Sequence, residues 1–153
     1  MSRLIFLDSG PLGLVSMPPP QPFAEECRDW VDRILSGGDE IVLPEIADYE
    51  VRRELLRARK IRGLRLLDSL KLQFIYMPIT TQVMQRAAIL WAQSRQTGKP
   101  TSPSDALDGD VILSAQALIA AEQSSYPVLI ATTNTRHLSQ FVAADLWSNI
   151  QPN

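Results

Sequence analysis

The chain has 153 residues, of which 45% are hydrophobic and 21% charged, and its formal net charge is −2. This composition excludes disordered and fibrous proteins and predicts one compact domain over residues 1–153. No apolar run approaches the roughly 18 residues of a membrane span, and no signal peptide is recognisable, so we expect a cytoplasmic protein. The single cysteine, Cys27, excludes an internal disulfide and a zinc knuckle, and we interpret it as a small core residue.

The first candidate element is the apolar run over residues 4–7, which Asp8 follows at once. Consecutive apolar residues indicate a strand that is buried on both faces, as in the centre of a parallel sheet. Such sheets bind ligands at the carboxyl ends of their strands, which is where Asp8 stands. A carboxylate beside a hydrophobic core must be paired, protonated or bound to a metal. The simpler interpretation is a turn-forming Asx residue ahead of Gly10.

The rest of the chain alternates between helical and extended patterns. In chain order, we predict a proline-rich loop over 17–22, a helix over 24–36, a strand over 40–43, helices over 45–60 and 64–70, a strand over 74–79, a helix capped by Thr80 or Thr81 that ends at 98–100, a loop over 101–104, an alanine-rich helix over 111–121 with acids at its start, and a strand over 126–131. This order implies right-handed crossovers. We therefore predict a three-layer α/β/α sandwich with a central parallel sheet of four to five strands.

Oxygen-bearing side chains are expected to gather at one edge of this sheet. They are Asp8 after the first strand, Glu50 in the second long helix, Asp108 and Asp110 at a helix start, and Asn134 after the last strand. Carboxylates and amides, without clustered cysteine or histidine, suit Mg²⁺ or Mn²⁺ better than Zn²⁺. Acids share a pocket only if a cation offsets their repulsion, and such cations can hold a phosphodiester for attack by water. The pattern indicates phosphodiester hydrolysis.

Each of these residues also has a structural interpretation. Asp108 and Asp110 suit a helix N-terminus, and two residues apart they cannot face one point, so we favour Asp110 as a ligand and Asp108 as a cap or auxiliary ligand. Glu50 lies one helical turn after an apolar residue, but an ion pair with Arg53 is an alternative. Asn134 suits a left-handed turn. The only histidine, His137, is interpreted as a loop or helix-start residue.

Basic residues are concentrated in one stretch of the sequence. Seven of the 15 lie between residues 52 and 65, against a single acid, Glu54. Such a stretch attracts phosphates over a short range, and we expect Arg57, Arg59 and Arg62 to steer RNA. The alternatives are a solvated helix face and a docking surface for a partner protein.

The arrangement resembles the PIN-domain ribonucleases, especially the VapC-like toxins of bacterial toxin-antitoxin pairs. The resemblance covers nearly the whole chain and depends on four motifs in order: LIFLDSG from Leu4, LPEIADYEVRREL from Leu43, DVILSAQAL from Asp110 and VLIATTNTRHL from Val128. It implies that Asp8, Glu50 and Asp110 bind one or two Mg²⁺ or Mn²⁺ ions and cut RNA. It also implies polar roles at the substrate for Ser9, Thr132 and Asn134, an antitoxin partner and, by analogy, a homodimer.

Two positions depart from the family pattern. Asn134 stands where the family has a fourth acid, which puts a second metal ion in question, and Gly10 stands where many relatives carry a polar residue. One alternative function is therefore a PIN-like module that binds RNA or protein without cutting it. A phosphatase with an Asp nucleophile is less favoured, because it needs a second Asp at position 10. No P-loop motif is present, and neither the acidic pair nor the lysine of a receiver domain is found.

Overall fold

The computed structural model describes residues 2–97 and 104–153, with side chains from residue 107 onward in the second range. Five parallel strands form one sheet in the order β3-β2-β1-β4-β5. The elements are β1 (Leu4–Leu7), α1 (Ser9–Val15), α2 (Pro22–Ser36), β2 (Glu40–Pro44), α3 (Glu45–Arg57), α4 (Ile61–Gln73), β3 (Ile75–Met77), α5 (Thr81–Gln96), α6 (Ser104–Ser124), β4 (Val128–Thr132), η1 (Leu138–Gln140), β5 (Ala144–Leu146) and η2 (Trp147–Asn149).

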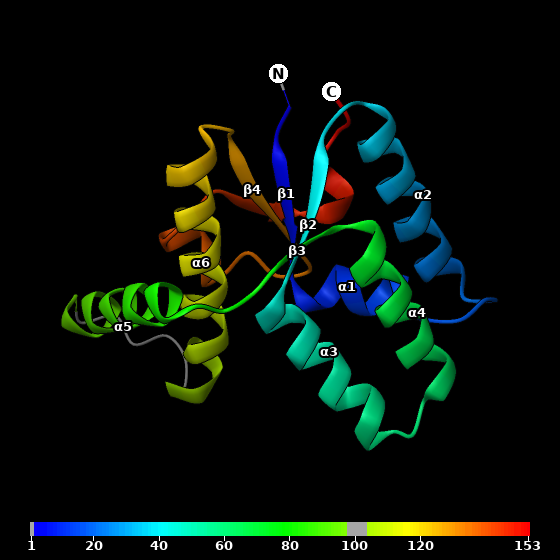
Figure 1. Ribbon diagram of the computed structural model, residues 1–153, viewed down its shortest axis with the longest axis horizontal. Helices are drawn as coiled ribbons and strands as arrows, with labels where there is room; N and C mark the ends of the chain where they lie inside the picture. The colour runs from blue at the N-terminus through cyan, green and yellow to red at the C-terminus, as the bar shows by residue number, and fades with distance from the viewer. Residues whose placement is uncertain (1, 98–103) are drawn as a thin grey trace.

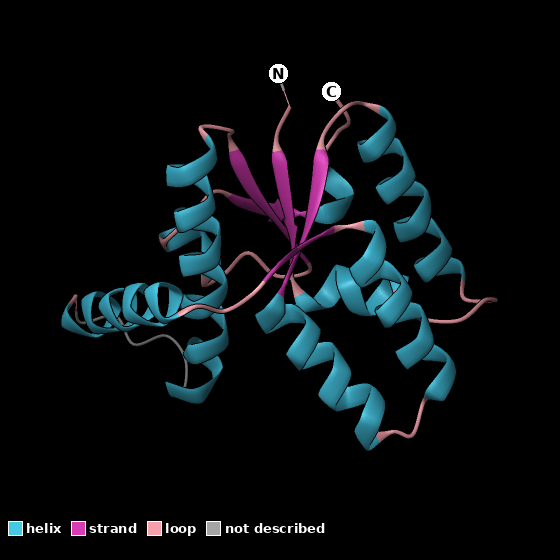
Figure 2. Cartoon of the chain, viewed as in Figure 1, coloured by secondary structure: helices cyan, strands magenta, loops and turns pink. Residues whose placement is uncertain are grey.

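Helices cover both faces of the sheet (Figure 2). Alternate residues of β1 serve the two faces: Ile5 and Leu7 pack with residues of α1 and α2, whereas Leu4 and Phe6 pack with residues of α6. All four side chains are buried, which is why this strand lacks an alternating pattern. Helix α5 packs in turn on α6 and extends away from the sheet (Figure 1). The predicted three-layer architecture with a central parallel sheet is confirmed.

The direction of strand addition reverses beside β1. The chain builds β2 and β3 on one side of β1, and then places β4 and β5 on the other side. The carboxyl ends of β1 and β4 therefore flank the switch point of the sheet, which is where open α/β sheets bind ligands. Asp8 follows β1 directly, and Thr132 is the last residue of β4. The fold thus places both residues at the expected binding edge.

Several element boundaries differ from the sequence predictions. Asp8 does not lead into a turn, because it is the N-cap of α1, a helix that was not predicted. Helix α6 begins at Ser104, so the expectation that Asp108 and Asp110 open this helix was wrong. The sequence also gave no indication of β5. The expected end of the preceding helix at 98–100 and most of the loop over 101–104 lie outside the described residues.

The remaining elements match their predictions closely. Thr80 caps α5 by accepting a hydrogen bond from the Val83 amide (3.2 Å), and Cys27 is buried as predicted. Helix α3 ends at Arg57, three residues earlier than predicted, and α4 is longer than predicted at both ends. None of the helices that the structure describes is both long and apolar enough to cross a membrane.

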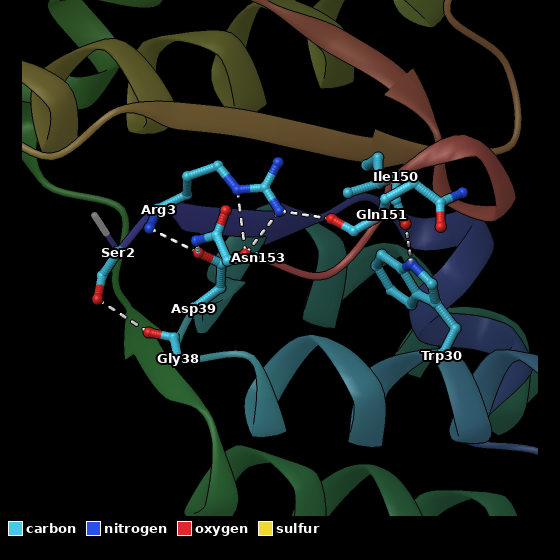
Figure 3. Close-up of polar contacts among 8 residues, drawn as sticks. All are labelled: Ser2, Arg3, Trp30, Gly38, Asp39, Ile150, Gln151 and Asn153. Atoms are coloured by element: carbon cyan, nitrogen blue, oxygen red, sulfur yellow. Dashed lines mark hydrogen bonds and ion pairs between the residues drawn. The ribbon is translucent and has the colours of Figure 1, made fainter.

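A polar network between the two ends of the chain lies at the amino edge of the sheet (Figure 3). Asp8 follows β1 at the other edge. The side chain of Asp39 is fully buried and accepts bonds from the Arg3 amide (2.8 Å) and guanidinium (2.6 and 3.0 Å). Asn153 donates to the same carboxylate (2.6 Å), and Trp30 donates to the Ile150 carbonyl (2.9 Å). This network joins the starts of β1 and β2 to the C-terminal segment.

Candidate active site

Asp8 is fixed by two hydrogen bonds at the start of α1. Its Oδ1 accepts a bond from the Ser9 amide (2.7 Å), and its Oδ2 accepts one from the Thr132 hydroxyl (2.8 Å). Thr132 is itself buried, and its hydroxyl oxygen accepts a bond from the Asn134 amide (3.1 Å). The Asp8 carboxylate is therefore held in one orientation by groups from both strands of the switch point.

Glu50 reaches the same edge of the sheet from α3. It lies one helical turn after the buried Ile46, and the side chain is half-buried. Its carboxylate lies against the backbone of Gly109 in α6, since a Cβ placed on that glycine would be 2.9 Å from Oε2. The alternative of an ion pair with Arg53 is not observed: the Arg53 guanidinium lies over the Tyr49 ring, 5.1 Å from its centroid.

Asp110 is the third carboxylate of the group and comes from the interior of α6. It is half-buried, whereas Asp108, two residues earlier, is exposed. Residues two apart on a helix point about 200° away from each other. Because α6 begins four residues before Asp108, the interpretation of Asp108 as a cap was wrong, and its exposure also separates it from the three clustered acids.

The three acids are electrostatically coupled, and each has a raised pKa. Burial raises the pKa of Asp8, although the bonds from Thr132 and Ser9 oppose this shift. Burial and then the Asp8 charge raise the pKa of Glu50, against a smaller effect of Arg53. Burial, with the charges of Asp8 and Glu50, raises the pKa of Asp110 to about 7. Acids in this situation favour either a bound proton or a bound cation.

The donor set fits a hard divalent cation in its chemistry, because every member is an oxygen ligand. The carboxylates, however, are not as closely grouped as the ligands of a closed metal site. Among the side chains of residues 2–97 and 107–153, no three of Asp, Glu, His or Cys are arranged as a ready metal-binding group. The structure thus brings Asp8, Glu50 and Asp110 within mutual electrostatic reach, but does not draw their oxygens around one point.

The turn after β4 contains Asn134, one of the residues predicted to contact the substrate. Asn134 is exposed, and its Oδ1 accepts a bond from the Arg136 amide (3.0 Å). Its backbone does not have a positive φ, so the interpretation as a left-handed turn residue was wrong. Thr133 packs tightly on Gly10: a Cβ at Gly10 would lie 2.5 Å from the Thr133 hydroxyl oxygen. This contact gives a packing reason for the glycine at position 10.

An open cavity of about 970 Å³ runs from Glu50 along α1, α3 and α4. Of the three clustered acids, Glu50 lines it, together with Ser9 and Gly10 next to Asp8. Two groups of lining residues matter for binding. The aliphatic residues are Leu14, Met17, Val51, Leu55 and Ile61, and the basic residues are Arg53, Arg57, Arg59, Lys60 and Arg62. The predicted phosphate-attracting residues therefore lie on a cavity that reaches Glu50.

The basic residues between positions 52 and 65 differ in their ion-pair partners. Arg52 bridges α3 and α4 by pairing with the buried Asp48 (2.9 Å) and with Asp68 (2.7 Å). Arg57 pairs with Glu54 (2.8 Å) on the surface. Among the ion pairs of the described residues, none includes Arg59, Lys60 or Arg62. The charge of Arg57 is thus partly neutralised by Glu54 at the surface, while Arg52 serves the packing of two helices.

Sequence reasoning missed two contributors to this site. Helix α1 was signalled by the N-cap residue Asp8 and by a proline, Pro11, in the first turn. The other signal was Gly109. Glycine is unfavourable inside a helix, so its presence there suggests that another group occupies the space a side chain would fill. That group is the Glu50 carboxylate, but only the structure reveals it.

Solved structures share this fold over nearly their whole length. VapBC2 from Rickettsia felis, bound to a DNA fragment from their promoter, matches with a TM-score of 0.70 at 13% identity, covering 94% of this chain and 98% of that chain. FitAcB from Neisseria gonorrhoeae matches with 0.65 at 20%, covering 95% and 99%. VapBC-1 from nontypeable Haemophilus influenzae matches with 0.67 at 12%, covering 95% and 99%.

Neither a protein-family model nor a curated protein sequence matches the chain. At identities of 12% to 20%, the structural likeness shows the fold. The PIN-like fold that the sequence resemblance implied is therefore confirmed.

Proposed function

We propose that this chain is a metal-dependent ribonuclease that hydrolyses RNA phosphodiester bonds and acts as the toxin of a toxin-antitoxin pair. One observation carries the proposal: Asp8, Glu50 and Asp110 come from three separate elements and meet, electrostatically coupled, at the switch point of a PIN-like sheet. Grouped carboxylates with raised pKa values destabilise a fold, so their presence supports a functional role.

Asp8, Glu50 and Asp110 would hold Mg²⁺ or Mn²⁺. When bound, the ion would supply positive charge that offsets the negative charge of the phosphodiester, and it would lower the pKa of a water molecule. The chain's own residues contribute orientation and proton control. Thr132 fixes Oδ2 of Asp8, and Asp110, with a pKa of about 7, exchanges a proton near neutral pH when no cation is present.

RNA is proposed to approach the three acids along the cavity that Glu50 lines. Arg59 and Arg62 line this cavity and supply positive charge, and Arg57 adds charge that is partly neutralised by Glu54. Ser9, Thr132 and Asn134 lie near Asp8 and are the proposed polar contacts to the substrate. Neutralising Arg57, Arg59 and Arg62 together should weaken RNA binding and flatten its dependence on salt. An unchanged salt slope would remove these residues from the proposal.

The test of the enzymatic proposal is cleavage of RNA with and without Mn²⁺ or Mg²⁺. We expect cleavage to depend on the ion, and we expect Asp8→Asn and Asp110→Asn to fold but to lose it. Asp108→Asn is the matched control, since Asp108 is a neighbouring but exposed acid. Intact RNA in millimolar Mn²⁺, together with retained RNA binding, would instead support the alternative of a PIN-like binding module.

We also propose that an antitoxin protein occupies the cavity when the chain is inhibited. The cavity combines aliphatic and basic residues, and among its lining residues there is no aromatic ring on which a base can stack. Such a surface suits a protein segment with aliphatic and acidic side chains. The test is co-expression with a candidate antitoxin: Arg59→Glu with Arg62→Glu should abolish complex formation, and an unaffected complex would place the partner elsewhere. The homodimer and the cytoplasmic location stay predictions.

A further inference from the structure

Gly109 stands at a helical position where glycine is locally unfavourable. It lies inside α6, one residue before Asp110, and it lacks the positive φ that the structure shows at Gly38. Conformational freedom therefore does not account for it, and only proline forms helices less well. Another property of glycine, the absence of a side chain, must explain its presence.

The space beside Gly109 is taken by the carboxylate of Glu50. A Cβ on Gly109 would lie 2.9 Å from Oε2, 3.5 Å from Cδ and 3.7 Å from Oε1 of Glu50. Carbon and oxygen atoms that are not bonded do not approach to 2.9 Å without displacement. The displaced group would be the end of a flexible side chain, while the backbones of α3 and α6 need not move.

We propose that Gly109 is a positioning residue that lets the Glu50 carboxylate lie against α6, beside Asp110. The inference rests on the proposed metal site, where both acids are ligands. A methyl group at position 109 displaces the Glu50 carboxylate from its place against α6, and so changes its position relative to Asp110, while the helix stays intact. Gly109 thus sets the separation of two ligands without contacting an ion or a substrate.

The chain offers a matched control in Gly13, which lies inside α1. A Cβ at Gly13 would meet only the Val51 side chain, at 3.9 Å, which is an ordinary contact. Gly13→Ala and Gly109→Ala therefore make the same chemical change in two helices, one with space and one without. Both should fold, because alanine is the better helix former.

The experiment combines Mn²⁺ titration by calorimetry with thermal unfolding in the metal-free state. Gly109→Ala should weaken Mn²⁺ binding by about tenfold or more, the range for residues that orient metal ligands, while Gly13→Ala should leave it unchanged. In a Glu50→Ala background, Gly109→Ala should no longer change Mn²⁺ affinity. Equal affinity of Gly109→Ala and the parent protein would overturn the inference.

The unfolding measurement tests the contact without any metal. Alanine at 109 should raise the Tm more in the Glu50→Ala background than in the parent protein, since no carboxylate then needs to move. If the parent protein binds no Mn²⁺ but this difference appears, the metal site fails and the positioning of Glu50 stands. Identical Tm changes in both backgrounds would show that Gly109 does not position Glu50.

Discussion

The hydroxyl of Thr132 donates a 2.8 Å hydrogen bond to Oδ2 of Asp8, and so links the carboxyl ends of β4 and β1. This bond favours the ionised form of Asp8 and opposes the effect of burial on its pKa. Thr132→Val keeps the shape of the side chain but removes the donor. We expect a loss of about 1–2 kcal/mol in the free energy of unfolding near neutral pH.

The pH dependence of this loss follows from the sign of the effect. Removing the bond raises the folded-state pKa of Asp8 further, so the stability difference is full above the pKa of Asp8 in the folded variant and shrinks as pH falls through the raised pKa values of the two folded proteins. Urea unfolding at pH 8 and pH 4 measures the difference. Thr133→Ser keeps the hydroxyl that packs on Gly10 at the exposed neighbour, and should change stability by less than about 0.5 kcal/mol at both values. A loss that is equal at the two pH values would contradict the role of Asp8 as acceptor.

Asp110 makes the metal-free protein less stable as pH rises. Its pKa in the folded protein is raised to about 7, from an ordinary value of 3.8, so the folded state resists its ionisation. Stability from this group is full below pH 3.8 and is lost as pH rises toward 7. Asp110→Asn should therefore stabilise the protein at pH 8, on the order of 1 kcal/mol after solvent screening, and have little effect at pH 4.

This second prediction is measured by thermal unfolding in a chelator. Asp108→Asn serves as the control, because Asp108 lies two residues away on the same helix and is exposed. Excess Mn²⁺ should reverse the ranking at pH 8, since binding to the parent site adds stability that Asp110→Asn cannot gain. A destabilised Asp110→Asn in chelator would show that the acids do not repel one another.

The fold was predictable because the strongest signals were long and local. The continuous apolar runs of β1 and β4 identify buried parallel strands, and the strands alternate with helical patterns. Short elements were harder to predict from the sequence. β5 spans three residues, Ala144–Leu146, and depends for its identity on pairing with β4, which no local pattern encodes.

The residues of the site also divide into those with a local sequence signal and those whose contacts depend on packing. Asp8 and Asp110 were found because each adjoins a strong apolar element, and Glu50 because its helical phase points inward. The contact between Glu50 and Gly109 joins residues 59 positions apart, and depends on how two helices pack. The start of α6 was misplaced because Asp108 and Asp110 mimic the acidic first turn of a helix, although that helix begins at Ser104.

Two arginines of the same basic stretch should differ in their effect on stability. Arg52 holds Asp48, which is buried, and also Asp68 on α4. Arg52→Met leaves the Asp48 charge without its partner, and we expect a loss of about 1–3 kcal/mol in the free energy of unfolding. Arg57→Met breaks only an exposed pair with Glu54, so its effect should stay below about 0.5 kcal/mol. Equal losses in denaturant unfolding would contradict the distinction.

Stability and metal binding should be separable, because Arg3 and the buried Asp39 form their ion pair just before β1 and β2 (Figure 3), whereas Asp8 follows β1 at the opposite edge of the sheet. Asp39→Asn keeps the size of the side chain but removes the charge that Arg3 and Asn153 contact. Breaking such a pair from one side leaves the other partner uncompensated, and we expect a loss of about 3 kcal/mol.

Mn²⁺ affinity and RNA cleavage per folded molecule should not change in Asp39→Asn, because the substitution leaves Asp8, Glu50 and Asp110 in place. The adjacent Glu40 is exposed, so Glu40→Gln should alter neither property and controls for charge at this edge. Calorimetric titration at 10 °C, where the weakened variant remains folded, compares the affinities directly. A parallel loss of Mn²⁺ affinity in Asp39→Asn would mean that the two edges of the sheet are coupled through β1, and that the acids are held by the whole strand rather than by their local contacts.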